Sequence, residues 1–321
     1  MNIGILAIGD ELTSGRIQNT NAAWIADRIN RQGWHVCAML AVGDEENAIE
    51  QAVAYFPGRC DAVVVTGGLG PTPDDITAEA LSKACGLILV RNDQVLTAMQ
   101  NRFATHSIRW RESHARMALF PEGAEVIPNP VGSAWGFSLM HRGCLFIVLP
   151  GVPGEATCMV TDSVIPLLKS HDPTPPAAMV SRTLKCCGIT ESDLEEKIRS
   201  LIPEERGVRI GFYPMFPEVH LVLTARHSSG KIAEEVLDQA EAAIAAPLAP
   251  YLFGRNDETL EGVVGTLLTA KGLTLSVAES CTGGLIADRL TDVSGSSLYV
   301  ERGVVTYSNT AKVDLLQVPE A

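Results

Sequence analysis

The stretch that most constrains the fold of this chain is residues 61–77, where an apolar run passes directly into a glycine-rich loop. Residues 62–65 read Ala-Val-Val-Val, a β-branched run without polar alternation. Such a run predicts a short buried strand of a parallel sheet. The loop after it lacks side-chain bulk, so its backbone N–H groups can approach a ligand closely. Its residues include Thr66, Gly67, Gly68 and Gly70.

Two carboxylates follow this loop at the start of a predicted helix. They belong to Asp74 and Asp75, and Thr77 comes two residues later. Amides that donate to anionic oxygens, followed by carboxylates able to hold a divalent cation, indicate a phosphate-bearing ligand. The alternative interpretation is structural: a strand–turn–helix corner capped by Asp75 or Thr72.

Three further loops are expected at the same edge. The apolar run 3–8 ends at Asp10 and Glu11, and the run 144–149 ends in a loop with Gly151 and Glu155. A turn-rich stretch, 129–137, contains Asn129 and Gly132 and is expected to be irregular, while Asn19 precedes an amphipathic helix. Strands and helices alternate at these spacings, which predicts an α/β fold with a doubly wound, mainly parallel sheet. Ligands bind at the carboxyl ends of the strands in such sheets.

The composition of the 321 residues bounds the class of protein. Apolar residues make up 46% and charged residues 20%, which allows proper cores and excludes a disordered chain. The formal net charge of −13 disfavours nucleic acid and anionic membranes as partners. No apolar run approaches about 20 residues, so we expect no signal peptide, no membrane span and a cytoplasmic location. The eight cysteines form no C-x-x-C pair, so we predict buried thiols rather than disulfides or zinc ligands.

A local cationic cluster stands out inside this acidic chain. Its members are Arg109, Arg111, His114 and Arg116. The simplest interpretation is a solvated helix face, and the alternative is a patch that attracts a phosphate.

The rest of the chain divides by composition. Residues 171–176 contain three prolines in four residues and predict a linker. A small α+β unit is expected at 177–250 and a third unit from 257. In the third unit, a serine with a lysine and a tyrosine is a workable nucleophile set, because a desolvated lysine can act as a base. Spacing alone is a weak indication of such a set.

Together, the motifs of this chain resemble the CinA family, which is named for competence and damage inducibility. Residues 1–170 resemble its molybdopterin-binding-like domain, 177–250 its KH-like domain, and 257–321 the first part of its nicotinamide-mononucleotide deamidase domain, an incomplete α/β domain here. Pro73 and Trp135 depart from the residues that many relatives carry. The matching segments are 9–12, 66–72, 74–77, 129–130 with 132, and 149–155.

This resemblance implies metal-dependent hydrolysis of ADP-ribose to AMP and ribose 5-phosphate, with Mg²⁺ or Co²⁺ and favoured by K⁺. It implies that Asp75 and Glu155 bind the metal and position the attacking water. The ligand-binding residues that it implies are Asp10, Glu11, Asn19, Thr66, Gly67, Gly68, Gly70, Asp74, Thr77, Asn129, Gly132 and Gly151. Molybdopterin binding, and a non-catalytic partner protein in competence or damage response, are the alternative functions.

For the third domain, the resemblance implies nicotinamide mononucleotide as the substrate. Ser297 matches the nucleophile, Tyr307 and Lys312 match its activating partners, and Ser280 lies in the substrate-binding motif. The second glycine-rich segment of that domain is absent here, so we predict no deamidase activity. KH folds clamp RNA with a Gly-x-x-Gly loop. No such loop stands between the right elements here, which favours a spacer or dimerisation role. A homodimer is expected from the family.

Overall fold

The computed structural model describes residues 1–172, 177–202 and 207–319. Residues 173–176, which form most of the predicted linker, lie outside the described residues. The chain divides into two compact units, one of residues 1–179 with 227–230 and one of residues 180–226 with 231–321.

The first unit is built around a six-stranded sheet with the order β2-β1-β3-β8-β7-β6. The four neighbouring strands β2, β1, β3 and β8 run parallel, and β7 and β6 are added antiparallel at one edge. This confirms the predicted mainly parallel sheet. The bounds are β1 (Asn2–Ile8), β2 (His35–Val42), β3 (Ala62–Thr66), β6 (Glu125–Ile127), β7 (Gly136–His141) and β8 (Cys144–Leu149).

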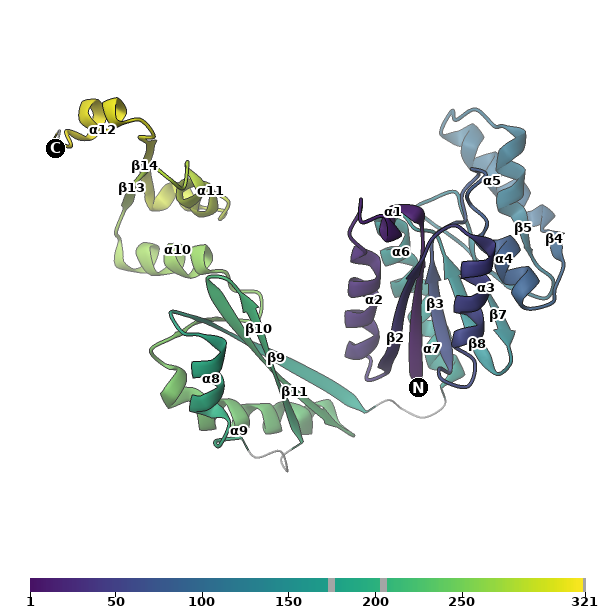
Figure 1. Ribbon diagram of the computed structural model, residues 1–321, viewed down its shortest axis with the longest axis horizontal. Helices are drawn as coiled ribbons and strands as arrows, with labels where there is room; N and C mark the ends of the chain where they lie inside the picture. Colours follow the sequence, from purple (N-terminus) through teal and green to yellow (C-terminus); the bar gives the residue numbers. More distant parts are fainter. Residues whose placement is uncertain (173–176, 203–206, 320–321) are drawn as a thin grey trace. The chain divides into compact units, whose positions relative to one another are not determined.

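Helices cover both faces of this sheet (Figure 1). Along β1, Ile3 and Ile5 belong to the core shared with α2, α6 and α7. Leu6 and Ile8 belong to the core shared with α3, α4 and α5. Successive side chains of a strand point to opposite faces, so this division confirms the doubly wound fold class. The helices are α1 (Asp10–Thr13), α2 (Thr20–Arg31), α3 (Glu46–Tyr55), α4 (Thr77–Ala84), α5 (Asp93–Thr105), α6 (Pro153–Met159), the π segment η2 (Val160–Val164) and α7 (Ile165–His171).

A small excursion lies between α4 and β6. It contains β4 (Leu89–Arg91), α5, the 3₁₀ helix η1 (Glu112–Ala118) and β5 (Leu119–Pro121). Strands β4 and β5 pair antiparallel as a separate ribbon. The excursion carries η1 back toward the loops that follow β3.

The expectation that residues 129–137 are irregular is wrong at the end of this stretch. Gly136 and Phe137 begin β7 and pair with β6 and β8. A Cβ on Gly136 would lie 2.5 Å from the Val148 carbonyl oxygen. Gly136, which was predicted to lie in a turn, therefore allows β7 and β8 to lie close together.

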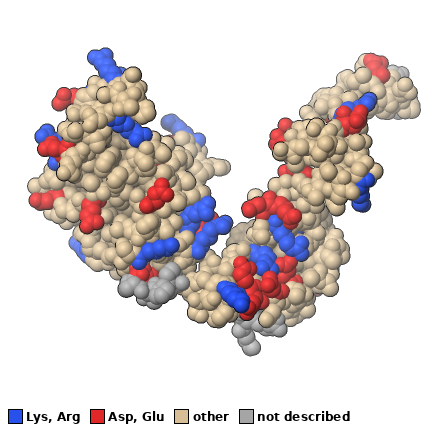
Figure 2. Space-filling model, turned by 180° about the vertical axis from the view of Figure 1, so that it is seen from behind, with Lys and Arg blue, Asp and Glu red and all other residues tan. Residues whose placement is uncertain are grey.

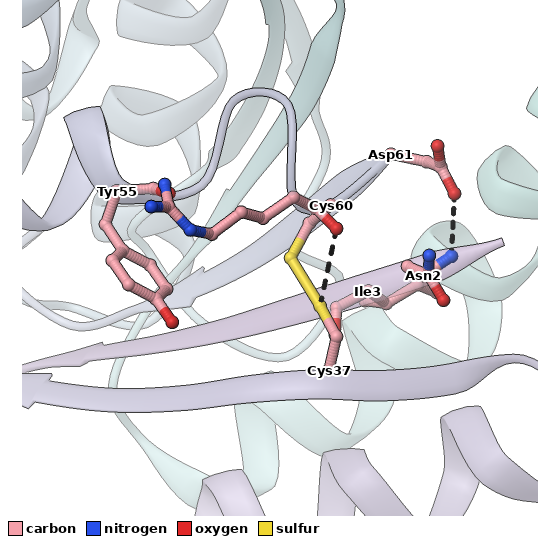
Figure 3. Close-up of a disulfide and its surroundings, with 7 residues drawn as sticks. Asn2, Ile3, Cys37, Tyr55, Cys60 and Asp61 are labelled. Atoms are coloured by element: carbon pink, nitrogen blue, oxygen red, sulfur yellow. Dashed lines mark hydrogen bonds between the residues drawn. A yellow bond between two sulfur atoms is a disulfide. The ribbon is translucent and has the colours of Figure 1, made fainter.

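The prediction that all cysteines are thiols is also wrong, because Cys37 and Cys60 form a disulfide (Figure 3). Cys37 is the additional residue where the β1–β2 register shifts between Ile3 and Gly4. Strand β1 pairs with β2 on one side and with β3, which follows Cys60, on the other. A Cβ on Gly4 would lie 3.4 Å from Cys60 Sγ, so the bond reaches across β1 at a residue without a side chain. The other six cysteines are free thiols, and Cys281 is exposed rather than buried.

The middle part of the second unit is a four-stranded sheet with the order β10-β11-β9-β12, packed with two helices. Thr190 caps the first helix, since its Oγ1 accepts from the Asp193 amide at 3.2 Å. Strand β12 was not predicted. The elements are β9 (Ala178–Cys187), α8 (Glu191–Ile198), β10 (Val208–Met215), β11 (Glu218–His227), α9 (Gly230–Leu248) and β12 (Leu252–Arg255).

Charged side chains of both signs lie together on this part of the molecule (Figure 2). Arg182 of β9 forms ion pairs with three carboxylates of α9 at 2.8–3.1 Å, those of Glu234, Asp238 and Glu241. Arg255 of β12 pairs with Glu241 as well, at 2.8 Å. The network fixes α9 to two strands of the sheet.

The C-terminal part of the second unit contains a parallel pair of strands flanked by helices. Its elements are α10 (Leu260–Lys271), β13 (Leu275–Glu279), α11 (Leu285–Thr291), η4 (Ser296–Leu298), β14 (Val300–Val305) and α12 (Asn309–Leu316). Within the described ranges of both units, no helix has the length and apolar character needed to span a membrane.

Candidate active site

A cavity of about 790 Å³ lies where β1, β3 and β8 end at their carboxyl edge. This is the edge at which open α/β sheets bind ligands. The cavity brings together most of the residues predicted for the first unit, from four separate loops. They are Glu11, Gly67, Gly68, Gly70, Asp74, Asp75, Gly132, Gly151 and Glu155.

The glycine loop after β3 has a conformation that requires glycine at two positions. Gly67 and Gly68 have φ values of 110° and 63°. A Cβ on Gly67 would lie 2.1 Å from the Ile8 carbonyl oxygen, and one on Gly68 would lie 2.1 Å from Thr77 Oγ1. The loop therefore packs directly on the end of β1 and on the start of α4.

The prediction that three loop amides cradle phosphates needs one correction. The Gly67 amide donates to the Leu149 carbonyl oxygen at 3.0 Å, so it joins the loop to the end of β8. Among the described residues, no hydrogen bond occupies the amides of Gly68 and Gly70. These two amides remain as donors for an anionic ligand.

Two carboxylates stand directly against glycines of the cavity wall. A Cβ on Gly70 would lie 2.5 Å from Asp75 Oδ2, and one on Gly132 would lie 2.1 Å from Glu155 Cδ. Glu155 lies in the first turn of α6, where the helix dipole favours a negative charge. A side chain at Gly70 or Gly132 would overlap these carboxylates. Asp75 and Glu155 can therefore take their positions only because both neighbours are glycines.

Asn129 holds Glu155 and the loop beneath it. It is buried, and its Nδ2 donates to Glu155 Oε2 at 2.6 Å and to the Ala134 carbonyl oxygen at 2.9 Å. Its Oδ1 accepts from the amides of Val131 and Gly132 at 3.1 and 2.8 Å. All of its side-chain polar atoms are hydrogen-bonded inside the protein, where they support the cavity wall. Its contact with a ligand stays a prediction.

Asp10 and Asp44 lock two loops together. The Asp10 amide donates to Asp44 Oδ2 at 2.9 Å, and the Asp44 amide donates to Asp10 Oδ1 at 3.0 Å. Asp44, which was not predicted, lines the cavity, whereas the predicted Asp10 lies outside its lining. Burial, together with the charges of Asp10, Glu11 and Asp74, raises the pKa of Asp44.

Three other predicted ligand residues lie outside the cavity lining. Asn19 caps α2, because its side chain accepts from the Ala22 amide at 3.0 Å. Thr66 is buried at the end of β3. Thr77 is buried beneath Gly68, and its Oγ1 has no hydrogen-bond partner within the described part of the chain.

The structure adds site residues that the sequence analysis missed. Arg102 and His106, at the end of α5, also line the cavity. Arg102 Nη1 also donates to the Pro130 carbonyl oxygen at 3.0 Å, and Asn21 Nδ2 donates to the Gly151 carbonyl oxygen at 2.7 Å. Asp44 could have been found, because it lies two residues after the apolar strand β2. No local pattern indicated the arginine and the histidine.

The carboxylates of the cavity fit a divalent cation in their chemistry. Five acidic residues line the cavity, and their carboxylate oxygens could serve as metal ligands. They are Glu11, Asp44, Asp74, Asp75 and Glu155. Mg²⁺ is typically held by one or two carboxylates together with substrate phosphates and water. Within the described ranges, no three His, Cys, Asp or Glu residues form a ready-made metal cluster. Asp75 and Glu155 are the two carboxylates of this set that the sequence predicts as metal ligands.

The cationic cluster predicted around residue 110 is not a single phosphate site. Arg109 and Arg111 are exposed, whereas His114 Nδ1 accepts from the Arg111 amide at 2.9 Å. The His114 ring packs against Phe103 and Trp110, with ring centroids 4.7 and 5.3 Å away. These neighbours give the histidine a structural role.

The candidate deamidase residues lie in the C-terminal part. Tyr307 is 74% exposed, Ser297 lies on η4, and Lys312 Nζ donates to Asn309 Oδ1 at 3.4 Å. No hydrogen bond connects these three side chains in the part of the chain that the structure describes.

The loop that contains Ser280 is organised by its neighbour Glu279. The Glu279 carboxylate is buried and accepts from the amides of Gly284, Ile286 and Ala287 at 2.9–3.2 Å. Burial acts to raise the pKa of Glu279, but the hydrogen bonds to its carboxylate outweigh it and lower the pKa.

Comparison with known proteins assigns a family to each part of the chain. A family model described as "Probable molybdopterin binding domain" matches residues 4–170. The models "Damage-inducible protein CinA KH domain" and "CinA C-terminal domain" match residues 181–254 and 257–321. Among solved structures, the protein CinA from Thermoplasma acidophilum is 31% identical and covers 52% of this chain and 97% of its own, with a TM-score of 0.48.

Curated relatives match the chain over its whole length. A CinA-like protein of Syntrophus aciditrophicus is 50% identical over 321 residues, which is 100% of this chain and 76% of the relative. A CinA-like protein of Geotalea uraniireducens is 42% identical over 320 residues, with the same coverage of 100% and 76%. These matches show that the chain belongs to the CinA family.

Proposed function

We propose that the first unit hydrolyses the pyrophosphate of ADP-ribose to AMP and ribose 5-phosphate, with Mg²⁺ or Co²⁺ as cofactor and K⁺ as a favourable ion. The observation that carries the proposal is one cavity in which unoccupied glycine amides lie beside carboxylates. The cavity of about 790 Å³ is large enough for a dinucleotide-sized ligand. The proposed products belong to nucleotide salvage.

Each group of residues has a distinct task in this proposal. The amides of Gly68 and Gly70 donate to phosphate oxygens, and Asp75 and Glu155 hold the cation and orient the water. A divalent cation supplies charge neutralisation at the phosphates and makes water a stronger acid. Asn129 keeps Glu155 at the cavity wall through its 2.6 Å hydrogen bond. Arg102 and His106 also line the cavity, and the positive charge of Arg102 favours an anionic ligand.

A direct test compares the products of the wild-type protein with those of Asp75→Ala and Glu155→Ala. We expect AMP and ribose 5-phosphate from the wild type and a loss of at least about 10²-fold in kcat for each variant, because both carboxylates act at the reacting phosphate. Asp93→Ala is the matched control, since its side chain is 74% exposed and, among the described residues, forms an ion pair with Arg91 alone. Products are separated and quantified chromatographically with Mg²⁺ and K⁺ present.

Wild-type hydrolysis of ADP-ribose by Asp75→Ala would contradict the metal mechanism. A folded wild-type protein that releases no AMP would contradict the ADP-ribose proposal. Tight binding of molybdopterin or its adenylated form would then favour the alternative that the first family model names.

For the remaining parts of the chain, we propose a homodimeric cytoplasmic protein whose middle domain acts as a spacer or dimerisation unit. We also propose that residues 257–321 do not deamidate nicotinamide mononucleotide. Support comes from Ser297, whose hydroxyl bonds to neither Tyr307 nor Lys312 in the described structure. Sedimentation velocity tests the dimer, and ammonia release from nicotinamide mononucleotide would contradict the second proposal.

A further inference from the structure

One arginine reaches the carboxylate-bearing turn from a distant segment. Arg116 lies in η1, 41 residues after Asp75. Its Nη1 donates to the Thr72 carbonyl oxygen at 2.7 Å, and its Nη2 donates to the Asp75 carbonyl oxygen at 3.1 Å. These carbonyls belong to the first and last residues of a four-residue turn. Both ends of the turn are thus tied to one rigid, planar group.

The same turn determines where the Asp75 carboxylate lies. The Asp75 amide donates to the Thr72 carbonyl oxygen at 3.1 Å, and the Thr72 amide donates to Asp75 Oδ2 at 2.9 Å. The Thr72 hydroxyl donates to the same oxygen. The carboxylate is folded back over the turn toward Gly70, so its position depends on the separation of residues 72 and 75.

Arg116 does not act as an ordinary ion-pair partner or as a wall of the large cavity. Within the described residues, its guanidinium hydrogen bonds go to these two carbonyls and not to a carboxylate. It lines only a small adjoining space of about 50 Å³, on the side of the turn toward Trp135. Its charge also lies close enough to Asp74 to contribute to lowering the pKa of that carboxyl, although no ion pair joins the two side chains among the described residues.

We propose that Arg116 is a positioning residue that holds Asp75 in place through the backbone of the Thr72–Asp75 turn. The arginine does not touch the substrate. The kinetic part of this inference rests on the proposed function. Its structural part, the closure of the turn by the guanidinium fork, does not.

The kinetic test uses Arg116→Ala and Arg116→Lys, with Arg109→Ala as the control. Arg109 is an exposed arginine of the same excursion and has no hydrogen bond among the described residues. We expect Arg116→Ala to lower kcat for ADP-ribose by about 10²-fold, because a displacement of a catalytic group by 1 Å can have such an effect. KM and the melting temperature should change far less. Lysine keeps the charge but not the planar fork, so Arg116→Lys should recover only part of kcat.

A second measurement tests whether Arg116 closes the Thr72–Asp75 turn, and it does not depend on enzymatic activity. Amide hydrogen exchange at Thr72 and Asp75 should be about tenfold faster in Arg116→Ala and in Arg116→Lys, because two hydrogen bonds that close the turn are lost or weakened. Exchange in β3 should stay as in the wild type. Unchanged exchange at the turn, or full kcat in Arg116→Lys, would overturn the inference. Faster exchange in a protein that does not hydrolyse ADP-ribose would confirm the clamp and contradict only the proposed function.

Discussion

Gly132 shows how a residue without a side chain fixes the place of a carboxylate. We expect Gly132→Ala to lower kcat by about 10²-fold with little loss of stability. A Cβ there would lie 2.1–2.3 Å from the carboxyl atoms of Glu155, at the far end of a flexible side chain that can move away. The fold therefore tolerates the methyl group, while the Glu155 carboxylate is displaced. Steady-state kinetics and thermal unfolding of the same samples measure both effects.

Gly154→Ala is the matched control for this substitution. Gly154 is also at the start of α6, and a Cβ on it would have no heavy atom within 4 Å. The kcat of Gly154→Ala should equal that of the wild type. Equal losses of kcat in Gly132→Ala and Gly154→Ala would show that a disturbance of α6, and not the displacement of the Glu155 carboxylate, lowers the activity.

Residue types and their order were enough to predict Asp75, Glu155, Gly68 and Gly70 at the cavity. The sequence could not separate residues that face the ligand from residues that support them. Asn129 has its side-chain polar atoms hydrogen-bonded inside the protein, and Gly67 lines the cavity but donates its amide to β8. Both belong to the same motifs as Gly68 and Gly70, whose amides have no hydrogen bond among the described residues. Which face of a loop meets solvent depends on contacts between segments that are far apart in sequence.

At the scale of elements, the disulfide joins the starts of two strands whose other ends carry the site. We expect Cys37→Ser to lower the free energy of unfolding of the first unit by about 2–4 kcal/mol, because the bond closes a loop between residues 23 apart in sequence. Urea unfolding measures the change. Reductant should bring the wild type to the stability of the variant.

Thiol titration checks the same bond directly. The chain has eight cysteines and six of them are free, so denatured, unreduced protein should titrate six thiols. A value of eight would contradict the disulfide. This bond was not predictable, since it depends on the register shift at Cys37 and on Gly4 of an intervening strand. Local runs such as Ala62–Thr66, by contrast, predict their own strands, because β-branched apolar residues need no distant partner to be recognised.

At the scale of the whole molecule, every residue assigned to hydrolysis lies in the first unit. The four loops of the cavity come from the sheet of residues 1–179, so the proposed reaction requires no residue of the second unit. The family of each part could be predicted, because sequence motifs are recognisable without any structure. The antiparallel additions β6 and β7 could not, since a short strand next to glycines and prolines has no clear local pattern.

The central claim is that water attacks a phosphate of ADP-ribose in this cavity. The most direct test is ³¹P NMR of the full chain with ADP-ribose, Mg²⁺ and K⁺ in ¹⁸O-enriched water. We predict AMP and ribose 5-phosphate in equal amounts, with the isotope shift of one ¹⁸O in only one of the two phosphates. Absence of both products, or products without ¹⁸O on phosphorus, would contradict it.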